Sequence, residues 1–213
     1  VTPAFERMLR QLAEKLDISD THYEAAERSY QSIGRWLNRV ESRVARYVPK
    51  IYSQGSFSLG TVIRPPTDED CFDLDVVCEA NCSKDAMTQE RLKANFGAEL
   101  AAYVEKHGME EIEPGQYCWT IRYAESAQFL VDVLPAVPDA AYQRQLLQEQ
   151  NLGLDWVDTA IGLTNTKHPQ YSVLCRNWHV SKPRAYSRWF RSRTEVLFNA
   201  RRRAMALAEG KAD

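Results

Sequence analysis

Apolar residues in the first fifty positions recur three or four apart, which is the spacing of one face of an α-helix. Thr2 and Pro3 make a typical helix start, because Thr caps free N–H groups and Pro suits the first helical position. A second and longer apolar stripe runs from Tyr23 to Tyr47. We therefore expect N-terminal helices within residues 1–49 that pack on a core through these stripes.

Strand-like segments follow in the middle of the chain. Residues 50–53 form a short run with apolar side chains, and residues 72–78 alternate between polar and apolar positions before turning apolar. Two further β-rich runs, 117–123 and 128–134, are joined by the short link 124–127. Such a short link favours an antiparallel pair.

Helix-like segments separate and follow these strands. Ser83 is expected to cap a helix that reaches about His107, and further helices are expected over residues 140–150 and 183–209. Residues 159–163 are expected to be extended. The order of a helical start, mixed strands and helices, and a helical end predicts an α+β domain.

The composition is that of a folded domain and excludes several classes of protein. Of the 213 residues, 44% are hydrophobic and 26% are charged, so the chain can build a core and is not intrinsically disordered. No apolar run approaches the ~20 residues that span a bilayer, and the polar start over residues 1–10 predicts no secretory signal. Five cysteines, an odd number, fit a reduced protein, so we expect a cytoplasmic location. From the lack of a long apolar run we expect no membrane partner.

Three aspartates stand in unusual surroundings for surface acids. Asp73 and Asp75 are two apart on a predicted strand, so both side chains project from one face, ~6–7 Å apart. Asp132 lies in an otherwise apolar strand, where a carboxylate is costly unless it is paired or metal-bound. If the two strands are neighbours, three carboxylates converge into a site that suits Mg²⁺. The alternatives are a structural Asp-x-Asp pair and an ion pair of Asp132 with Arg122 across the hairpin.

A glycine and a serine follow the first short strand. Gly55 lets the backbone approach a phosphate closely, and the Ser56 hydroxyl with the next N–H groups can donate hydrogen bonds to it. An ordinary turn is the alternative. The order of a phosphate-binding turn, a strand with paired carboxylates and a strand with a third carboxylate predicts a two-metal nucleotide site.

The same segments resemble a known family. Residues 54–65, QGSFSLGTVIRP, and residues 72–79, FDLDVVCE, closely resemble the signature of the DNA polymerase beta-like nucleotidyltransferase superfamily. The long glycine–serine form is similar to that of the bacterial CD-NTases, which are the cyclic-oligonucleotide synthases of anti-phage CBASS systems. Residues 178–190 are similar to a segment that such enzymes carry after the catalytic core.

The resemblance implies a fold, a reaction and a set of site residues. The fold would be a mixed, twisted sheet flanked by helices. The reaction would make cyclic di- or oligonucleotide second messengers from NTPs and release pyrophosphate. Asp73, Asp75 and Asp132 would be catalytic and hold two Mg²⁺ or Mn²⁺ ions, and Gly55 and Ser56 would bind the donor triphosphate.

The resemblance also implies three parts of the chain. Residues 1–49 would pack on the core, residues 50–180 would form the nucleotidyltransferase core, and residues 181–213 would begin a helical subdomain that is truncated here. Residues 171–213 carry ten Lys or Arg and three acids, whereas residues 64–90 carry eight acids and two bases. The basic segment would attract a regulatory protein or a nucleic-acid activator. A solvated helix face is the simpler interpretation of it.

Two other functions fit the same residues. One is the transfer of a nucleotide to RNA, a protein or a small molecule, and the other is a catalytically silent module that binds nucleotides. The intact set of three aspartates speaks against the silent module. Analysis of the products formed from the four NTPs would distinguish these two functions from the synthesis of cyclic oligonucleotides.

Overall fold

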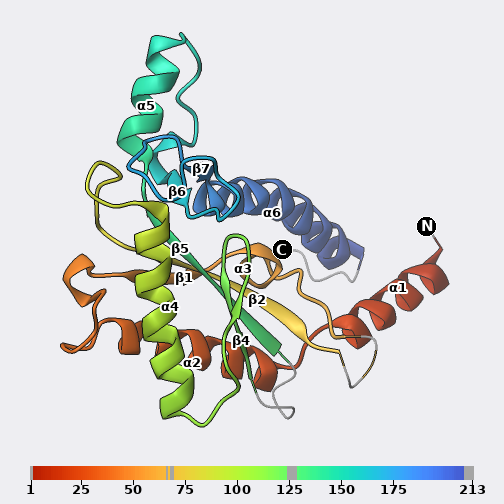
Figure 1. Ribbon diagram of the computed structural model, residues 1–213. Helices are drawn as coiled ribbons and strands as arrows, with labels where there is room; N and C mark the ends of the chain where they lie inside the picture. The colour runs from red at the N-terminus through yellow and green to blue at the C-terminus, as the bar shows by residue number, and fades with distance from the viewer. Residues whose placement is uncertain (1, 66, 68–69, 124–128, 209–213) are drawn as a thin grey trace.

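A mixed β-sheet lies at the centre of the molecule (Figure 1). The computed structural model describes residues 2–65, 67, 70–123 and 129–208, and seven strands of the sheet lie within them. In the order of the sheet, the strands are β1 (Lys50–Ser53), β2 (Phe72–Glu79), β5 (Phe129–Pro138), β4 (Trp119–Arg122) and β3 (Glu113–Pro114); β6 (Ile161–Leu163) pairs with the end of β5, and β7 (His179–Ser181) pairs with β6.

The two central strands, β2 and β5, run parallel and pair along the whole of β2. β1 pairs with β2, and β4 pairs with β5, both antiparallel. The predicted strand over residues 50–53 and the predicted antiparallel pairing of 117–123 with 128–134 are confirmed. The link 124–127 lies outside the described residues.

Helices surround the sheet. The α-helices are α1 (Pro3–Leu16), α2 (Asp20–Leu37), α3 (Gly55–Leu59), α4 (Gln89–Lys106), α5 (Ala140–Glu149) and α6 (Pro183–Ala208), and the short 3₁₀ helices are η1 (Ala45–Tyr47) and η2 (Val157–Thr159). Figure 1 shows α6 passing beside α3, while α1 and α5 project from the body. The α+β fold class is thus confirmed. Within the described ranges, no helix is long and apolar enough to cross a membrane.

One face of the sheet forms the main core with α2 and α4. Side chains alternate along a strand, so Leu74 and Val76 of β2 point to the same face, and both are fully buried. They belong to one apolar cluster with Ile33 of α2 and Phe96 of α4, which are also fully buried. The odd-numbered residues of β2 before Val77 therefore project from the opposite face, where the two aspartates lie.

The second helix ends earlier than its apolar stripe predicted. α2 ends at Leu37 and does not continue to Tyr47, and Val40 of the stripe is 93% exposed. Asn38 follows the helix, and its side-chain amide donates to the carbonyl of Pro49 at 2.9 Å. This polar side chain ties the helix end to the chain that enters β1, and it offers the backbone an alternative to further helix.

The helix predicted to start at Ser83 starts later. α4 begins at Gln89, because the Thr88 hydroxyl accepts a hydrogen bond from the N–H of Arg91 at 3.1 Å. Ser83 instead accepts from the N–H of Asp85, also at 3.1 Å, in a turn before the helix. Both side chains are suitable caps, and local sequence does not decide between them.

The first helix does not pack on the core, contrary to the prediction for residues 1–49. α1 has no buried residue, although the Thr2 hydroxyl caps it as predicted. Beyond Leu16 the chain forms a β-bridge from Asp17 to Ile63, and α1 projects away from the sheet (Figure 1). The spacing of apolar residues predicts that a helix has one apolar face, but it does not predict which part of the molecule packs against that face. The partly exposed apolar side chains of α1 are Phe5, Met8, Leu9, Leu12 and Leu16.

A buried ion pair joins the segment after β2 to the end of β5. The Lys84 ammonium contacts the Asp139 carboxylate, and the two side chains are 6% and 0% exposed. Removing one member of such a pair leaves an uncompensated charge in the interior.

We therefore expect Asp139→Ala to lower the free energy of unfolding by about 3–5 kcal/mol, because Lys84 would stay buried without its partner. Asp85→Ala is the control, since Asp85 pairs with Arg176 on the surface and its loss should change stability little. Denaturant titration measures both effects, and equal losses in the two variants would contradict the prediction.

Candidate active site

The chain after β1 opens the short helix α3 directly beside β2. Gly55 is the first residue of α3 and has a φ of +63°, a left-handed conformation that suits glycine. The N–H of Gln54 donates to the backbone carbonyl of Asp75 at 2.8 Å. A Cβ atom on Gly55 would lie 2.5 Å from the carboxylate Oδ2 of Asp75. The predicted phosphate-binding turn, Gly55 with Ser56, therefore begins in contact with one of the predicted metal-binding carboxylates.

Strand pairing brings two of the three aspartates side by side. In the parallel register of β2 and β5, Asp75 is the partner of Asp132, whereas Asp73 is the partner of Leu130. Asp73 shares a face with Asp75 and lies ~6–7 Å along the strand from it. Asp73 is exposed, while Asp75 and Asp132 are half-buried. The structure thus pairs Asp75 with Asp132 and leaves Asp73 at the open border of the site.

The carboxylates repel one another. Burial, then Asp132, then Asp73 raise the pKa of Asp75 from 3.8 to about 6. None of the ion pairs formed by the described residues includes any of these three aspartates. A bound cation would relieve the repulsion, as expected for a metal site and not for a structural acid pair.

Asp132 has a polar partner that the sequence analysis missed. Thr120 of β4 lies opposite Asp132, and its hydroxyl donates to Oδ1 of the carboxylate. Arg122, the alternative partner, lies opposite Leu130 instead and contacts Glu113 at 3.5 Å. The alternative of an ion pair between Asp132 and Arg122 is therefore wrong, because Arg122 lies two residues along β4 from the position opposite Asp132. Thr120 could have been predicted only from the register of the hairpin, and that register is set by the geometry of the connecting turn.

The donor set fits Mg²⁺. This ion usually takes one or two carboxylates from a protein and completes its octahedron with water and substrate phosphates. Asp75 and Asp132 supply two such carboxylates at paired positions. In the described part of the chain, no three His, Cys, Asp or Glu side chains lie close enough together to hold one ion. The aspartates therefore form no closed protein cage, and the phosphates of a nucleotide would have to complete the coordination.

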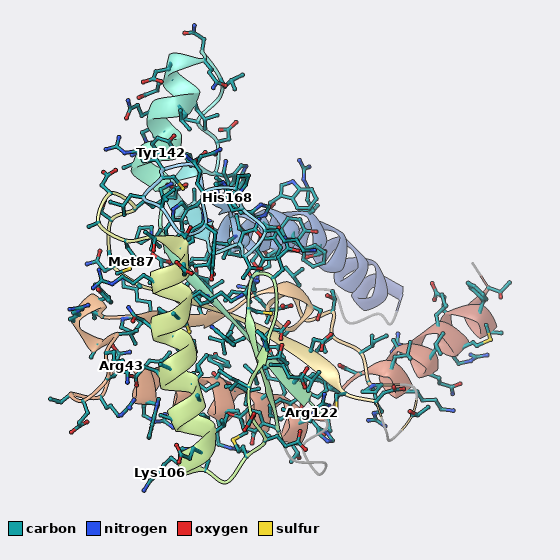
Figure 2. All side chains as sticks on the ribbon, viewed as in Figure 1. Arg43, Met87, Lys106, Arg122, Tyr142 and His168 are labelled. Atoms are coloured by element: carbon teal, nitrogen blue, oxygen red, sulfur yellow. The ribbon has the colours of Figure 1, made fainter. Side chains whose placement is uncertain are left out.

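A cavity of about 510 Å³ lies away from these carboxylates. It is lined by residues after β2 and at the start of α5, among them Lys84, Asp139 and Tyr142. Figure 2 labels Tyr142 at the base of α5 and Arg122 near the opposite end of the sheet. None of the three aspartates lines this cavity, so it is separate from the carboxylate site.

Comparison with solved structures identifies the class of fold. The structure is similar to Vibrio cholerae DncV in its 3'-deoxy GTP bound form, with a TM-score of 0.55 and 15% identity over 85% of this chain and 57% of that chain. It is also similar to E. coli CdnC in its complex with HORMA-deltaN, with a TM-score of 0.55 and 15% identity over 89% of this chain and 50% of that chain. These likenesses show that the molecule has the nucleotidyltransferase fold of the bacterial CD-NTases.

Sequence comparison then shows which family the segment with these residues is similar to. Residues 49–135 match the family described as Cyclic GMP-AMP synthase DncV-like, nucleotidyltransferase domain. This segment contains the five predicted site residues, and the predicted similarity to the bacterial CD-NTases is confirmed over it. The chain is 26% identical to a c-di-GMP synthase of Roseivirga ehrenbergii over 186 residues, which are 87% of this chain and 42% of the relative. It thus spans less than half the length of that curated relative.

Proposed function

We propose that this chain carries the catalytic domain of an Mg²⁺-dependent nucleotidyltransferase that makes cyclic di- or oligonucleotide second messengers from NTPs in anti-phage defence. The observation that carries the proposal is the pairing of Asp75 with Asp132 against Gly55, inside the segment that matches the DncV-like family. The similarity to a c-di-GMP synthase supports a cyclic product.

Each predicted site residue has a role in this proposal. Gly55 and Ser56 bind the triphosphate of the donor NTP. Asp73 and Asp75 would hold two Mg²⁺ or Mn²⁺ ions, and Asp132 would help to hold one of them and to take the proton of the acceptor hydroxyl. When bound, the ions neutralise the charge that develops around the α-phosphate and the leaving pyrophosphate. The acceptor oxygen bonds to the α-phosphorus as the bond to the pyrophosphate oxygen breaks.

The proposal extends to the surroundings of the site. Residues 50–180 form the catalytic core of a cytoplasmic protein, residues 1–49 precede it, and residues 181–213 lead into a helical subdomain. A regulatory protein or a nucleic acid binds through the basic C-terminal segment, of which Arg184 and Arg188 on α6 are exposed. The complex of E. coli CdnC with HORMA-deltaN is a precedent for a protein partner.

Product analysis tests the proposal. Incubation of the protein with the four NTPs and Mg²⁺ or Mn²⁺ is expected to give phosphatase-resistant products, whose masses identify cyclic di- or oligonucleotides. Asp73→Asn combined with Asp75→Asn is expected to abolish them, because both carboxylate ligands on β2 are lost. Mass spectrometry of the reaction mixtures measures both outcomes.

Glu110→Gln combined with Glu113→Gln is the matched control. It also removes two carboxylates, but these lie on the surface beside Arg122, and product formation should be unchanged. Products that survive the double aspartate change would overturn the site assignment. Linear or acceptor-linked products alone would indicate transfer to another acceptor. Retained NTP binding without any product would indicate the silent module.

A further inference from the structure

The short helix α3 depends on its neighbours for its position. An isolated helix of five residues is not stable in water, so contacts from other elements must hold it. β2 holds its start through the hydrogen bond from Gln54 to Asp75. α2 holds its middle through Tyr23, whose ring stacks on Phe57 at 4.2 Å and whose hydroxyl donates to the Phe57 carbonyl at 3.3 Å.

The end of α3 is held by α6. Arg191 Nη2 donates to the carbonyl of Ser58 at 3.1 Å, and the Ser187 hydroxyl lies 3.4 Å from the Ser58 hydroxyl. Ser187 and Arg191 are four residues apart, so they lie on the same face of α6. An arginine donating to the last carbonyls of a helix satisfies groups that have no partner within it. Figure 1 shows α6 passing close to α3 at this point.

The same face of α6 also reaches the strand that leads into α3. The Arg184 guanidinium lies 3.7 Å from the centre of the Tyr52 ring on β1 and forms an ion pair with Glu79 of β2 at 3.7 Å. α6 therefore contacts β1, β2 and α3, the three elements that bring Gly55 to Asp75.

We propose that Arg191, assisted by Ser187, is a positioning residue that holds α3 so that Gly55 stays against Asp75. The inference rests on the proposed function, because it concerns the nucleotide-binding turn of that site. Gly55 already approaches Asp75 so closely that a Cβ atom would lie 2.5 Å from the carboxylate, so α3 can only move away. Such a movement would separate the donor-binding turn from the carboxylate that holds the metal.

Three variants of α6 test this inference in the full chain. Arg191→Ala removes the contact, and Arg191→Lys keeps the charge and one donor. Arg193→Ala is the matched control: it removes the same charge two residues along the helix, where the side chain is exposed and no hydrogen bond or ion pair is present among the described residues.

The first measurement is amide hydrogen exchange without metal or NTP. The N–H groups of Gly60 and Thr61 donate back to α3, to Phe57 at 3.3 Å and to Ser56 at 2.9 Å. Their exchange is expected to be about tenfold faster in Arg191→Ala, because opening of α3 becomes easier. It should be unchanged in Arg193→Ala and close to wild type in Arg191→Lys.

The second measurement is the affinity for each NTP with Mg²⁺ by calorimetry. Arg191→Ala is expected to weaken NTP binding about fivefold, while Arg193→Ala leaves it unchanged. Unchanged exchange in Arg191→Ala would overturn the inference, and so would faster exchange with unchanged NTP affinity. Weaker binding with unchanged exchange would mean that Arg191 contacts the nucleotide itself, which also overturns positioning. If the wild-type protein binds no NTP, the proposed function fails and the inference fails with it.

Discussion

Asp75→Asn is expected to lower product formation strongly and, at the same time, to stabilise the metal-free protein. Loss of a carboxylate that holds a catalytic metal should lower NTP turnover by about 10³-fold, which corresponds to about 4 kcal/mol of transition-state stabilisation. The gain in stability has a separate cause. Burial and the neighbouring Asp132 and Asp73 make the charged form of Asp75 unfavourable, and they raise its pKa from 3.8 to about 6.

The gain in stability depends on pH in a definite direction. The pKa of Asp75 is higher in the folded protein than in the unfolded chain, so its ionisation destabilises the fold. This destabilisation is absent below the unfolded value of 3.8 and is complete above the folded value of about 6. At pH 7 the Asn variant should therefore be more stable by about 1 kcal/mol, a figure reduced for solvent screening of a partly exposed group. The corresponding rise in Tm is about 2–4 °C.

Thermal melts with EDTA at pH 4 and pH 7 measure this difference. At pH 4, where most of the destabilisation is absent, the variant should melt at nearly the same temperature as the wild type, and at pH 7 it should melt higher. Asp158→Asn is the control, because it removes a surface carboxylate that pairs with Arg188 at 3.3 Å, and it should show no gain. A variant of Asp75 that is no more stable than wild type at pH 7 would contradict the raised pKa of Asp75 in the folded protein.

Gly55→Ala is expected to lower NTP turnover by about 100-fold, because displacement of a substrate-binding group by about 1 Å has an effect of this size. The new methyl group would lie 2.5 Å from Asp75 Oδ2, so either α3 or the carboxylate must move. The alanine would also be strained at a φ of +63°. Steady-state kinetics of pyrophosphate release and calorimetry of NTP binding measure the loss.

Gly60→Ala distinguishes the effect of the steric clash with Asp75 from the effect of backbone strain at a positive φ. Gly60 ends the same helix with a φ of +68°, but a Cβ atom there would meet nothing within 4 Å. Both variants should lose about 1 kcal/mol of stability from the left-handed backbone. Only Gly55→Ala should lose activity beyond this common effect, and similar turnover in the two variants would argue against contact between Gly55 and Asp75 as a requirement of the site.

Much of the fold could be predicted from the chain because its elements have clear local signals. The short strand over residues 50–53 and the final helix from Pro183 follow from apolar spacing, turn residues and caps. The ends were less predictable where two signals compete. The apolar stripe continues past Leu37, but Asn38 turns the chain there, and Thr88 caps the helix for which Ser83 was also a candidate.

The site was partly predictable for a different reason. Asp73 and Asp75 share a face through strand alternation alone, and Gly55 and Ser56 stand in a recognisable motif. Tertiary partners have no such local signal. Thr120 reaches Asp132 only through the register of a hairpin, and Arg191 reaches α3 from far along the chain.

The parallel pairing of β2 with β5 makes the formation of the site depend on the register of two strands that are distant in the sequence. The partners lie far apart in the sequence and are joined through a helix and two strands, so this pairing is slow to form compared with local structure. A slip of β5 by one residue would turn Asp132 toward the face covered by α2 and α4 and place its carboxylate in an apolar core. The core on one side of the sheet thus selects the alignment that the chemistry on the other side requires, and a one-residue slip of β5 would leave the site without its third carboxylate.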